Sequence, residues 1–146
     1  MKMLLNKSGI HLLVLITSLL WMHQTLADVA VIANKSTTIG SIDKDTVKSI
    51  YLGKLKSWPD GSSLDVVDQS PGSKARRLFL KKVVRKKELK FDSYWSRKAF
   101  SGKGTPPRNM DNDADVKAWV AKTKGSIGFI DASTVDDSVK VLMLVK

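Results

Sequence analysis

One stretch near the middle of the chain constrains the fold most, because its pattern changes from strand to helix within a few residues. Residues 66–67 are two valines, as expected of a buried strand. Residues 68–72 then form a short polar segment with proline and glycine at its end, which predicts a turn. Over residues 73–79 apolar positions recur at helical spacing. A strand, a tight turn and a helix in this order favour an α/β domain.

The start of this predicted helix is a candidate anion-binding site. The first N–H groups of a helix have no acceptor within the helix, and they lie at the positive end of the helix dipole. Glycine lets a backbone approach an oxyanion closely, and serine adds a hydroxyl donor. The candidate contacts are Ser70, Gly72, Ser73, Lys74, Arg76 and Arg77. An alternative stays open here, because Ser70 or Ser73 also suits a plain helix N-cap.

The first 27 residues have the parts of a secretory signal peptide. Two lysines precede the mostly apolar run Ile10–Trp21, and Thr25-Leu26-Ala27 is a small-x-small cleavage pattern. A membrane anchor is the weaker interpretation, since a helix needs about 20 apolar residues to span a bilayer. We therefore expect cleavage after residue 27, a periplasmic location, no transmembrane segment in the mature form, and a single domain over residues 28–146.

Charge and composition narrow the function of the mature chain. The formal net charge is +11, and removal of the two leader lysines leaves +9, so we expect an anionic partner. The chain has no cysteine, and both of its histidines, His11 and His23, lie in the leader. The usual nucleophile–base pairs and zinc ligands are therefore absent from the mature chain. We expect no catalytic residue, no metal site and no cofactor.

Strand and helix patterns alternate along the rest of the mature chain. We expect strands over residues 28–33, 64–68, 127–130 and 139–145. We expect helices from a cap at Ser41 or Asp43 to Leu52, after Gly72, over residues 91–100, and from a cap at Asn112 or Asp113 to Gly125. The inward-facing residues of these helices are predicted to be Val47, Ile50, Tyr51, Ala75, Leu78, Phe79, Val83, Phe91, Tyr94, Trp95, Ala99, Val116, Trp119 and Val120. The alternation predicts an α/β domain with a central sheet.

Three further motifs give weaker signals. A second glycine-rich basic loop offers secondary anion contacts, but it lacks P-loop spacing and also suits a turn that ends a helix; its candidate residues are Ser101, Gly102, Lys103 and Thr105. The acidic run that begins at Asp111 starts like a calcium loop but lacks the glycine and glutamate that such a loop requires. The basic run Arg85–Lys87 has no interleaved aromatic residues, which argues against nucleic acid as a partner.

Six segments occur in an order that matches a known family. They are Ser49-Ile50-Tyr51-Leu52-Gly53-Lys54, Trp58-Pro59-Asp60-Gly61, Gly72-Ser73-x-x-Arg76-x-x-Phe79, Tyr94-Trp95, Phe100-Ser101-Gly102-Lys103-Gly104-Thr105-Pro106-Pro107 and Gly125-Ser126-Ile127-Gly128-Phe129-Ile130. Together they resemble the phosphate-binding proteins of ABC transporters, and most of all the small, single-lobe exported proteins of that group. The resemblance covers nearly the whole mature chain.

This resemblance implies a single periplasmic-binding-protein-type lobe of the α/β class, with a central mixed sheet flanked by helices. It also implies an oxyanion at the helix start, where Ser73 matches the family's serine. In full-length relatives two lobes close on phosphate, which main-chain N–H groups, hydroxyls, an arginine and an acidic acceptor hold. This chain departs from that pattern, because residues 68–70 hold no arginine where the family has one and Lys74-Ala75 replaces Gly-Thr.

Two functional hypotheses follow. The leading one is an exported domain that recognises phosphate or a similar oxyanion, linked to an ABC permease and completed by a second lobe or a second copy. The alternative is a non-enzymatic interaction module whose basic surface binds an anionic polymer, a membrane surface or an acidic protein. The departures at the helix start and the net charge of +9 motivate the alternative.

Overall fold

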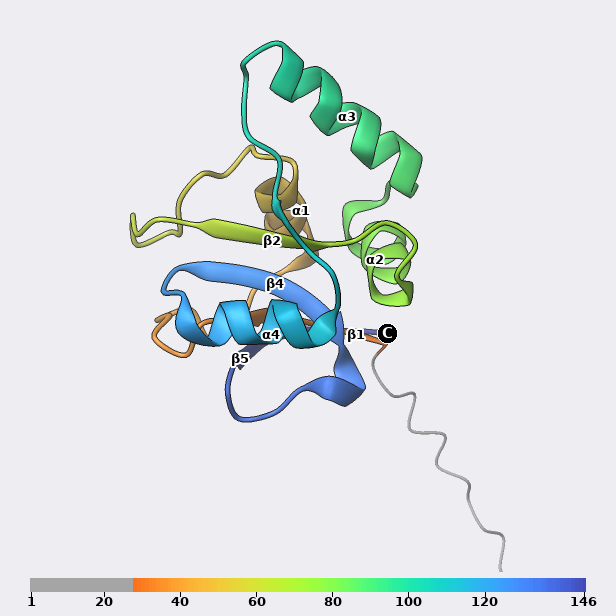
Figure 1. Cartoon of the computed structure of the whole chain (residues 1–146). Helices are drawn as coiled ribbons and strands as arrows, with labels where there is room; N and C mark the ends of the chain where they lie inside the picture. The colour runs from red at the N-terminus through yellow and green to blue at the C-terminus, as the bar shows by residue number, and fades with distance from the viewer. Residues whose placement is uncertain (1–27) are drawn as a thin grey trace, which may run out of the picture.

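The computed structural model describes residues 28–146, so the predicted signal peptide lies outside the described residues. The strands are β1 (Val29–Ala33), β2 (Asp65–Gln69), β3 (Arg108–Met110), β4 (Ser126–Asp131) and β5 (Lys140–Val145). The helices are α1 (Lys44–Tyr51), α2 (Lys74–Phe79), the π-helix η1 (Leu80–Val84), α3 (Glu88–Phe100), α4 (Asp113–Lys122) and the 3₁₀ helix η2 (Ala132–Thr134). They form an α/β domain with helices on both faces of a sheet (Figure 1).

The strands form one mixed sheet in the order β3-β2-β4-β1-β5. Strand β1 runs antiparallel to both β4 and β5, whereas β2 runs parallel to β3 and β4. All five residues of β1 are fully buried, as its apolar sequence predicts for a strand covered on both faces. The predicted fold class, a mixed sheet flanked by helices, is confirmed.

Two hydrophobic clusters cover the two faces of this sheet. On one face Val29 and Val31 of β1 pack in a cluster with residues of α1, α2, η1 and α3. On the other face Ala30 and Ile32 pack in a cluster that includes Val116 and Val120 of α4. The alternation along β1 is the period of two that a strand imposes on its side chains. Figure 1 shows α4 lying across the sheet on the side that faces the viewer.

Several predicted helix ends are confirmed. Asp43, and not Ser41, caps α1, since its carboxylate accepts a hydrogen bond from the N–H of Thr46 at 2.9 Å. Gly53 follows this helix with a φ of 67°, and Gly125 follows α4 with a φ of 77°, in the left-handed conformation expected after a helix. Asn112 caps α4 by accepting from the N–H of Asp115.

Other expectations about the helices were wrong. Helix α3 begins at Glu88, three residues before the start predicted at Phe91. Of its predicted inner residues, Phe91 and Trp95 are buried, Tyr94 is half-buried and Ala99 is exposed. On α4, the predicted inward position of Trp119 holds in part: the residue is half-buried and packs against the cluster on its face of the sheet, and its ring also lies beneath the guanidinium of Arg108 at 4.3 Å. This ring packs against a charged side chain of β3, a strand that was not predicted.

The sheet topology determines where the candidate site lies. Strands β2 and β3 are parallel and in register, with Gln69 opposite Met110, so their carboxyl ends meet at the same edge of the sheet. The segment 70–73 leaves β2 at this edge and enters α2 (Figure 1). In open α/β sheets, ligands bind outside the carboxyl ends of parallel strands.

Candidate anion-binding site

The turn between β2 and α2 is held by its own hydrogen bonds and by β3. The N–H of Ser70 donates to the carbonyl of Met110 at 2.9 Å, which extends the β2–β3 pairing by one residue. Gly72 then adopts a φ of 86°, a left-handed conformation that glycine reaches without strain. The hydroxyl of Ser73 accepts a hydrogen bond from the N–H of Arg76 at 3.1 Å. Ser73 is therefore the N-cap of α2, as one of the two sequence interpretations predicted.

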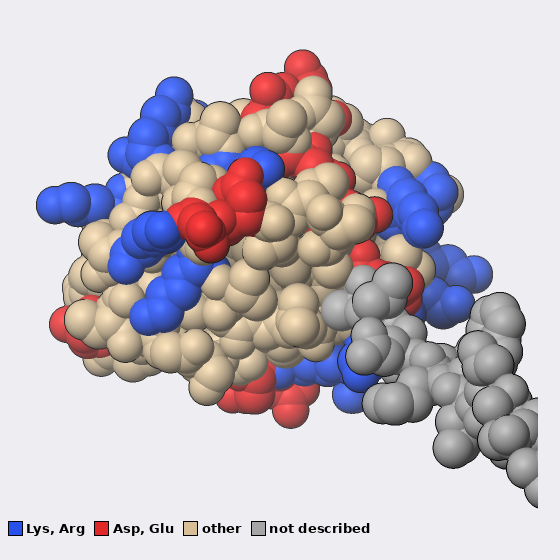
Figure 2. All heavy atoms as spheres, turned by 90° about the horizontal axis from the view of Figure 1, so that it is seen from below, with Lys and Arg blue, Asp and Glu red and all other residues tan. Residues whose placement is uncertain are grey.

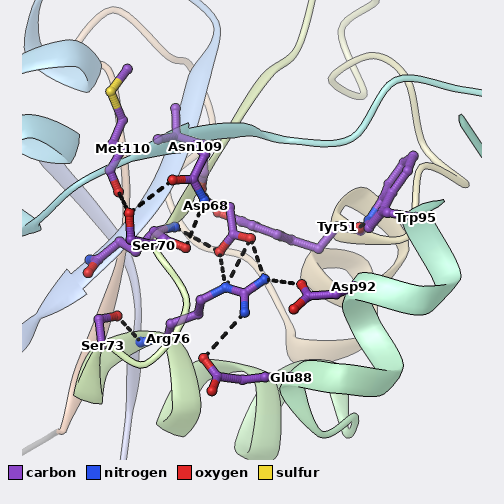
Figure 3. A network of polar contacts seen from close by, with 12 residues as sticks. Tyr51, Asp68, Ser70, Ser73, Arg76, Glu88, Asp92, Trp95, Asn109 and Met110 are labelled. Atoms are coloured by element: carbon purple, nitrogen blue, oxygen red, sulfur yellow. Dashed lines mark hydrogen bonds and ion pairs between the residues drawn. The ribbon is translucent and has the colours of Figure 1, made fainter.

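Ser70 lies beside Ser73 but is bound to β3 (Figure 3). Its hydroxyl donates to the side-chain oxygen of Asn109 at 3.1 Å, and the amide nitrogen of Asn109 donates to the carbonyl of Gln69 at 3.0 Å. Asn109 thus fixes the end of β2 through its side chain. No strand pattern in the sequence marks Asn109, because the three residues of β3 are exposed or half-exposed.

Arg76 occupies a different position from the one expected. Its side chain is only 2% exposed and points away from the turn, toward three carboxylates (Figure 3). Its guanidinium donates to Asp68 at 3.0–3.1 Å, to Asp92 at 2.6 Å and to Glu88 at 3.3 Å. We name this the Arg76 cluster. The Arg76 guanidinium is already shared among these three carboxylates. Arg76 therefore has a structural role beneath the turn between β2 and α2, and its charge is not free to bind an anion.

The protonation of the Arg76 cluster follows from its burial and its pairing. Burial raises the pKa of Asp68, and the hydrogen bonds and charge of Arg76 oppose that change. Burial alone would lower the pKa of Arg76, but hydrogen bonds to Asp68 and Asp92 outweigh it and raise that pKa above its ordinary value. These contacts therefore favour the charged form of the guanidinium. Three carboxylates surround one guanidinium, so the cluster carries more acid than base.

Glu88 brings one of these carboxylates to the turn itself. Its Oε1 accepts a hydrogen bond from the N–H of Gly72 at 3.1 Å as well as the bond from Arg76. An N–H group that was expected to contact an anion therefore already has an acidic acceptor. Glu88 was not among the predicted site residues, because it stands among lysines just before the predicted start of a helix at residue 91.

Three donors remain at the helix start. The N–H groups of Lys74 and Ala75 lie in the first turn of α2, where a helix offers no acceptor. The hydroxyl of Ser73 accepts from Arg76 and has its own proton to donate. The side chains of Lys74 and Arg77 are exposed, and Arg77 also bonds the carbonyl of Gly72. Hydrogen bonds from Ser133, with a smaller contribution from the nearby ammonium of Lys74, lower the pKa of Asp131.

The structure does not bring the second predicted set of anion contacts to this turn. Ser101, Gly102, Lys103 and Thr105 lie in the loop between α3 and β3, which enters β3 at Arg108, opposite Val67 of β2. Lys103 and Thr105 line a cavity together with Asp65 and Val66, at the amino end of β2. Five residues of strand, about 15 Å, separate this loop from the turn at Ser70.

Among residues 28–146, no group of three histidine, cysteine, aspartate or glutamate side chains is placed to hold a metal ion. The helices of the same region are also too short or too polar for any of them to cross a bilayer.

The cap geometry gives a stability prediction. Replacing Ser73 with alanine removes the acceptor for the N–H of Arg76, and we expect a loss of about 1 kcal/mol in the free energy of unfolding, measured by urea titration of tryptophan fluorescence. Ser96→Ala is the matched control, because Ser96 is exposed in the interior of α3. We expect this control to change stability by less than about 0.5 kcal/mol. Equal losses in both variants would contradict the capping role.

Comparison with known proteins connects this geometry to a family and a fold. A family model described as a PBP superfamily domain matches residues 23–142. A Clostridium perfringens structure assigned to the phosphate ABC transporter substrate-binding proteins, with bound phosphate, superposes with a TM-score of 0.66 at 23% identity, over 82% of this chain and 46% of that one. An ABC-type phosphate transport receptor from Vibrio cholerae gives 0.56 at 17%, over 80% and 46%. PstS from Borrelia burgdorferi gives 0.60 at 12%, over 80% and 46%.

These matches establish the fold of residues 28–146 as that of part of such proteins. The chain spans about half the length of the solved structures that it matches. The matched structures are 12–23% identical to this chain, and what they share with it is the fold.

Proposed function

The chain belongs to the PBP superfamily domain family, and from this premise we propose that it binds phosphate or a related oxyanion at the start of α2. The observation that carries the proposal is the set of donors at this point, namely the N–H groups of Lys74 and Ala75 and the hydroxyl of Ser73. Ser70 and Gly72 shape the turn, and the exposed charges of Lys74 and Arg77 attract the anion. Matched proteins of this fold include one solved with bound phosphate.

The proposed role is binding and not catalysis. We propose an exported protein, with residues 1–27 as its signal peptide and residues 28–146 as its domain, that acts with an ABC permease in the periplasm. Because the chain spans about half of the proteins that it matches, a second lobe or a second copy would close over the anion. A one-sided site leaves the anion in contact with water, where high dielectric weakens its interactions, so we expect weak binding by the isolated chain.

The alternative of a basic interaction surface has less support. Two basic side chains in and near the run Arg85–Lys87 already have partners, since Lys82 bonds Asp28 and the ammonium of Lys86 lies over the ring of Tyr94 at 5.8 Å. Figure 2 shows that the underside of the molecule carries acidic side chains among basic ones, with uncharged residues over most of the face. No continuous positive patch is visible on that face, and the family match favours anion binding.

The proposal is tested by titration calorimetry of the purified protein with phosphate, and with sulfate for comparison. Lys74→Ala removes one charge, whereas Lys74→Pro also removes the backbone N–H. Proline is well tolerated at the first position of a helix, so this variant should remain folded. We expect Lys74→Ala to weaken phosphate binding a few-fold and Lys74→Pro to weaken it about tenfold more, because a hydrogen bond to an anion contributes about 1.5 kcal/mol. The proposal would be contradicted if neither phosphate nor sulfate gave heat at millimolar concentration. It would also be contradicted if Lys74→Ala and Lys74→Pro bound phosphate with equal affinity.

The position of Glu88 gives a second binding prediction. Its carboxylate holds the N–H of Gly72 and repels an anion at the adjacent donors. Glu88→Gln should therefore tighten phosphate binding about fivefold, which corresponds to about 1 kcal/mol of like-charge repulsion near a protein surface. Asp137→Asn is the matched control, because it removes an exposed carboxylate in the loop before β5 and leaves the turn intact. Affinity that rises equally in both variants would show that only the net charge matters.

A further inference from the structure

A cavity of about 580 Å³ lies at the amino end of β2, opposite the end that carries the anion-binding turn. Its walls come from the end of α1, the start of β2, the middle of α3 and the loop that joins α3 to β3. Its apolar lining includes Ile50, Leu55, Leu64 and Trp95. The volume falls within the range of pockets that bind small organic molecules.

The aromatic wall of this cavity is held in place. Trp95 is buried, and its indole N–H donates to the carbonyl of Tyr51 at 3.0 Å. A β-carbon at Gly53 would lie 2.7 Å from the Trp95 ring, so the left-handed glycine that ends α1 allows the ring to pack there. Trp95 is therefore a fixed part of the cavity wall, of which only a small area is open to a ligand.

Four basic side chains surround the apolar part, and one of them is fixed. The ammonium of Lys98 donates to the carbonyl of Leu52 at 2.9 Å and to the hydroxyl of Tyr94 at 3.3 Å, and it lies over the Trp95 ring at 5.2 Å. An ammonium has three protons, so these two bonds leave one to donate to a ligand.

The other three basic groups differ in their pairing. Arg108 faces Asp65 at 3.7 Å, and Asp65 also accepts from the indole of Trp119. Lys56 and Lys103 are exposed, and neither forms an ion pair with another residue in the described part of the chain. Asp65 is the acidic residue among those that line the cavity, so the lining carries a net charge of +3.

We propose that this cavity binds an organic anion with a flat apolar body and a carboxylate or phosphate head group. The apolar body would lie against Leu55 and Leu64, and the head group would lie between Lys98 and the exposed ammonium groups of Lys56 and Lys103. Inorganic phosphate lacks the apolar body, so the cavity differs from the α2 site in the ligand that it selects. The proposal is independent of anion binding at α2.

Fluorescence and calorimetric titrations of the full protein test this site with a matched set of probes. The probes are 1-naphthyl phosphate, 1-naphthoate and uncharged 1-naphthol. We expect both anionic probes to saturate the cavity, with one molecule of 1-naphthoate bound per chain, and we expect 1-naphthol to bind at least tenfold more weakly than either. Inorganic phosphate should not displace the bound probe.

Variants assign the probe to the cavity. Replacing both Lys56 and Lys103 with serine should weaken the anionic probes about tenfold, and Lys98→Met should do the same while keeping the packing of the lysine stem. Lys35→Ser, at an exposed position after β1, and Ser73→Ala, at the α2 site, should leave probe binding unchanged. The proposal is wrong if no anionic probe saturates at 1 mM, if 1-naphthol binds equally well, or if the Lys56/Lys103 variant binds as tightly as the parent protein.

Discussion

Replacing Arg76 with methionine lowers the free energy of unfolding by about 3–5 kcal/mol, because it leaves the buried carboxylate of Asp68 without its cation. The side chain is 2% exposed and donates to Asp68, Asp92 and Glu88. Methionine matches the length of the arginine stem but provides no donor to these carboxylates. A domain of this size has about 5–15 kcal/mol of stability in total, so a large part of it depends on this one cation.

Arg77→Met is the matched control for this prediction. Arg77 follows Arg76 in the same helix, carries the same charge and is exposed, so we expect a change below about 0.5 kcal/mol. Urea unfolding followed by tryptophan fluorescence measures both variants. In the double variant Asp68→Leu with Arg76→Met we expect part of the loss to be recovered, since apolar pairs often replace buried ion pairs without a penalty. A loss below 1 kcal/mol in Arg76→Met would contradict the structural role of the Arg76 cluster.

The second large effect is expected for Phe79→Ala. The Phe79 ring stacks on the Phe129 ring of β4 with centroids 4.1 Å apart, and it meets the Tyr51 ring of α1 edge-on at 4.6 Å. Phe79 is fully buried, so truncation removes a large apolar surface and leaves a cavity between the sheet and two helices. We expect a loss of about 3–5 kcal/mol in the free energy of unfolding.

Phe100→Ala provides the control, because it deletes the same atoms from a residue that is 97% exposed at the end of α3. We expect this variant to unfold within about 0.5 kcal/mol of the parent protein. Calorimetric unfolding would show the Phe79 variant alone at a lower melting temperature. Similar melting temperatures for the two variants would mean that the aromatic cluster contributes little to the stability of the sheet–helix contact.

Much of the fold could be predicted because local patterns determine it. The buried strand β1 is a continuous apolar run, and the helix ends at Asp43, Gly53 and Gly125 carry residues with strong conformational preferences. Strand β3 was missed for a physical reason: it has only three residues, two of them polar, and it lies at the sheet edge, so no hydrophobic period marks it. Its pairing with β2 depends on the tertiary fold.

The candidate site was predicted in part. The cap at Ser73 is local and follows from residue type, and the structure confirms it. The role of Arg76 could not be found in this way, because its partners lie 8 residues before it and 12 and 16 residues after it. Only the packing of α3 against α2 brings Glu88 and Asp92 to the guanidinium. Binding of an anion at this turn is our central proposal.

The most direct test of this proposal is a phosphate titration of the isotopically labelled protein, followed by amide chemical shifts in ¹H–¹⁵N correlation spectra. If phosphate binds at the start of α2, the N–H signals of Lys74 and Ala75 will shift and saturate together with one phosphate per chain, with smaller shifts at Gly72 and Ser73. In Lys74→Pro the shift of Ala75 will be weaker. Phosphate that leaves the Lys74 and Ala75 signals in place while other amides shift, or that shifts none, would contradict anion binding at the start of α2.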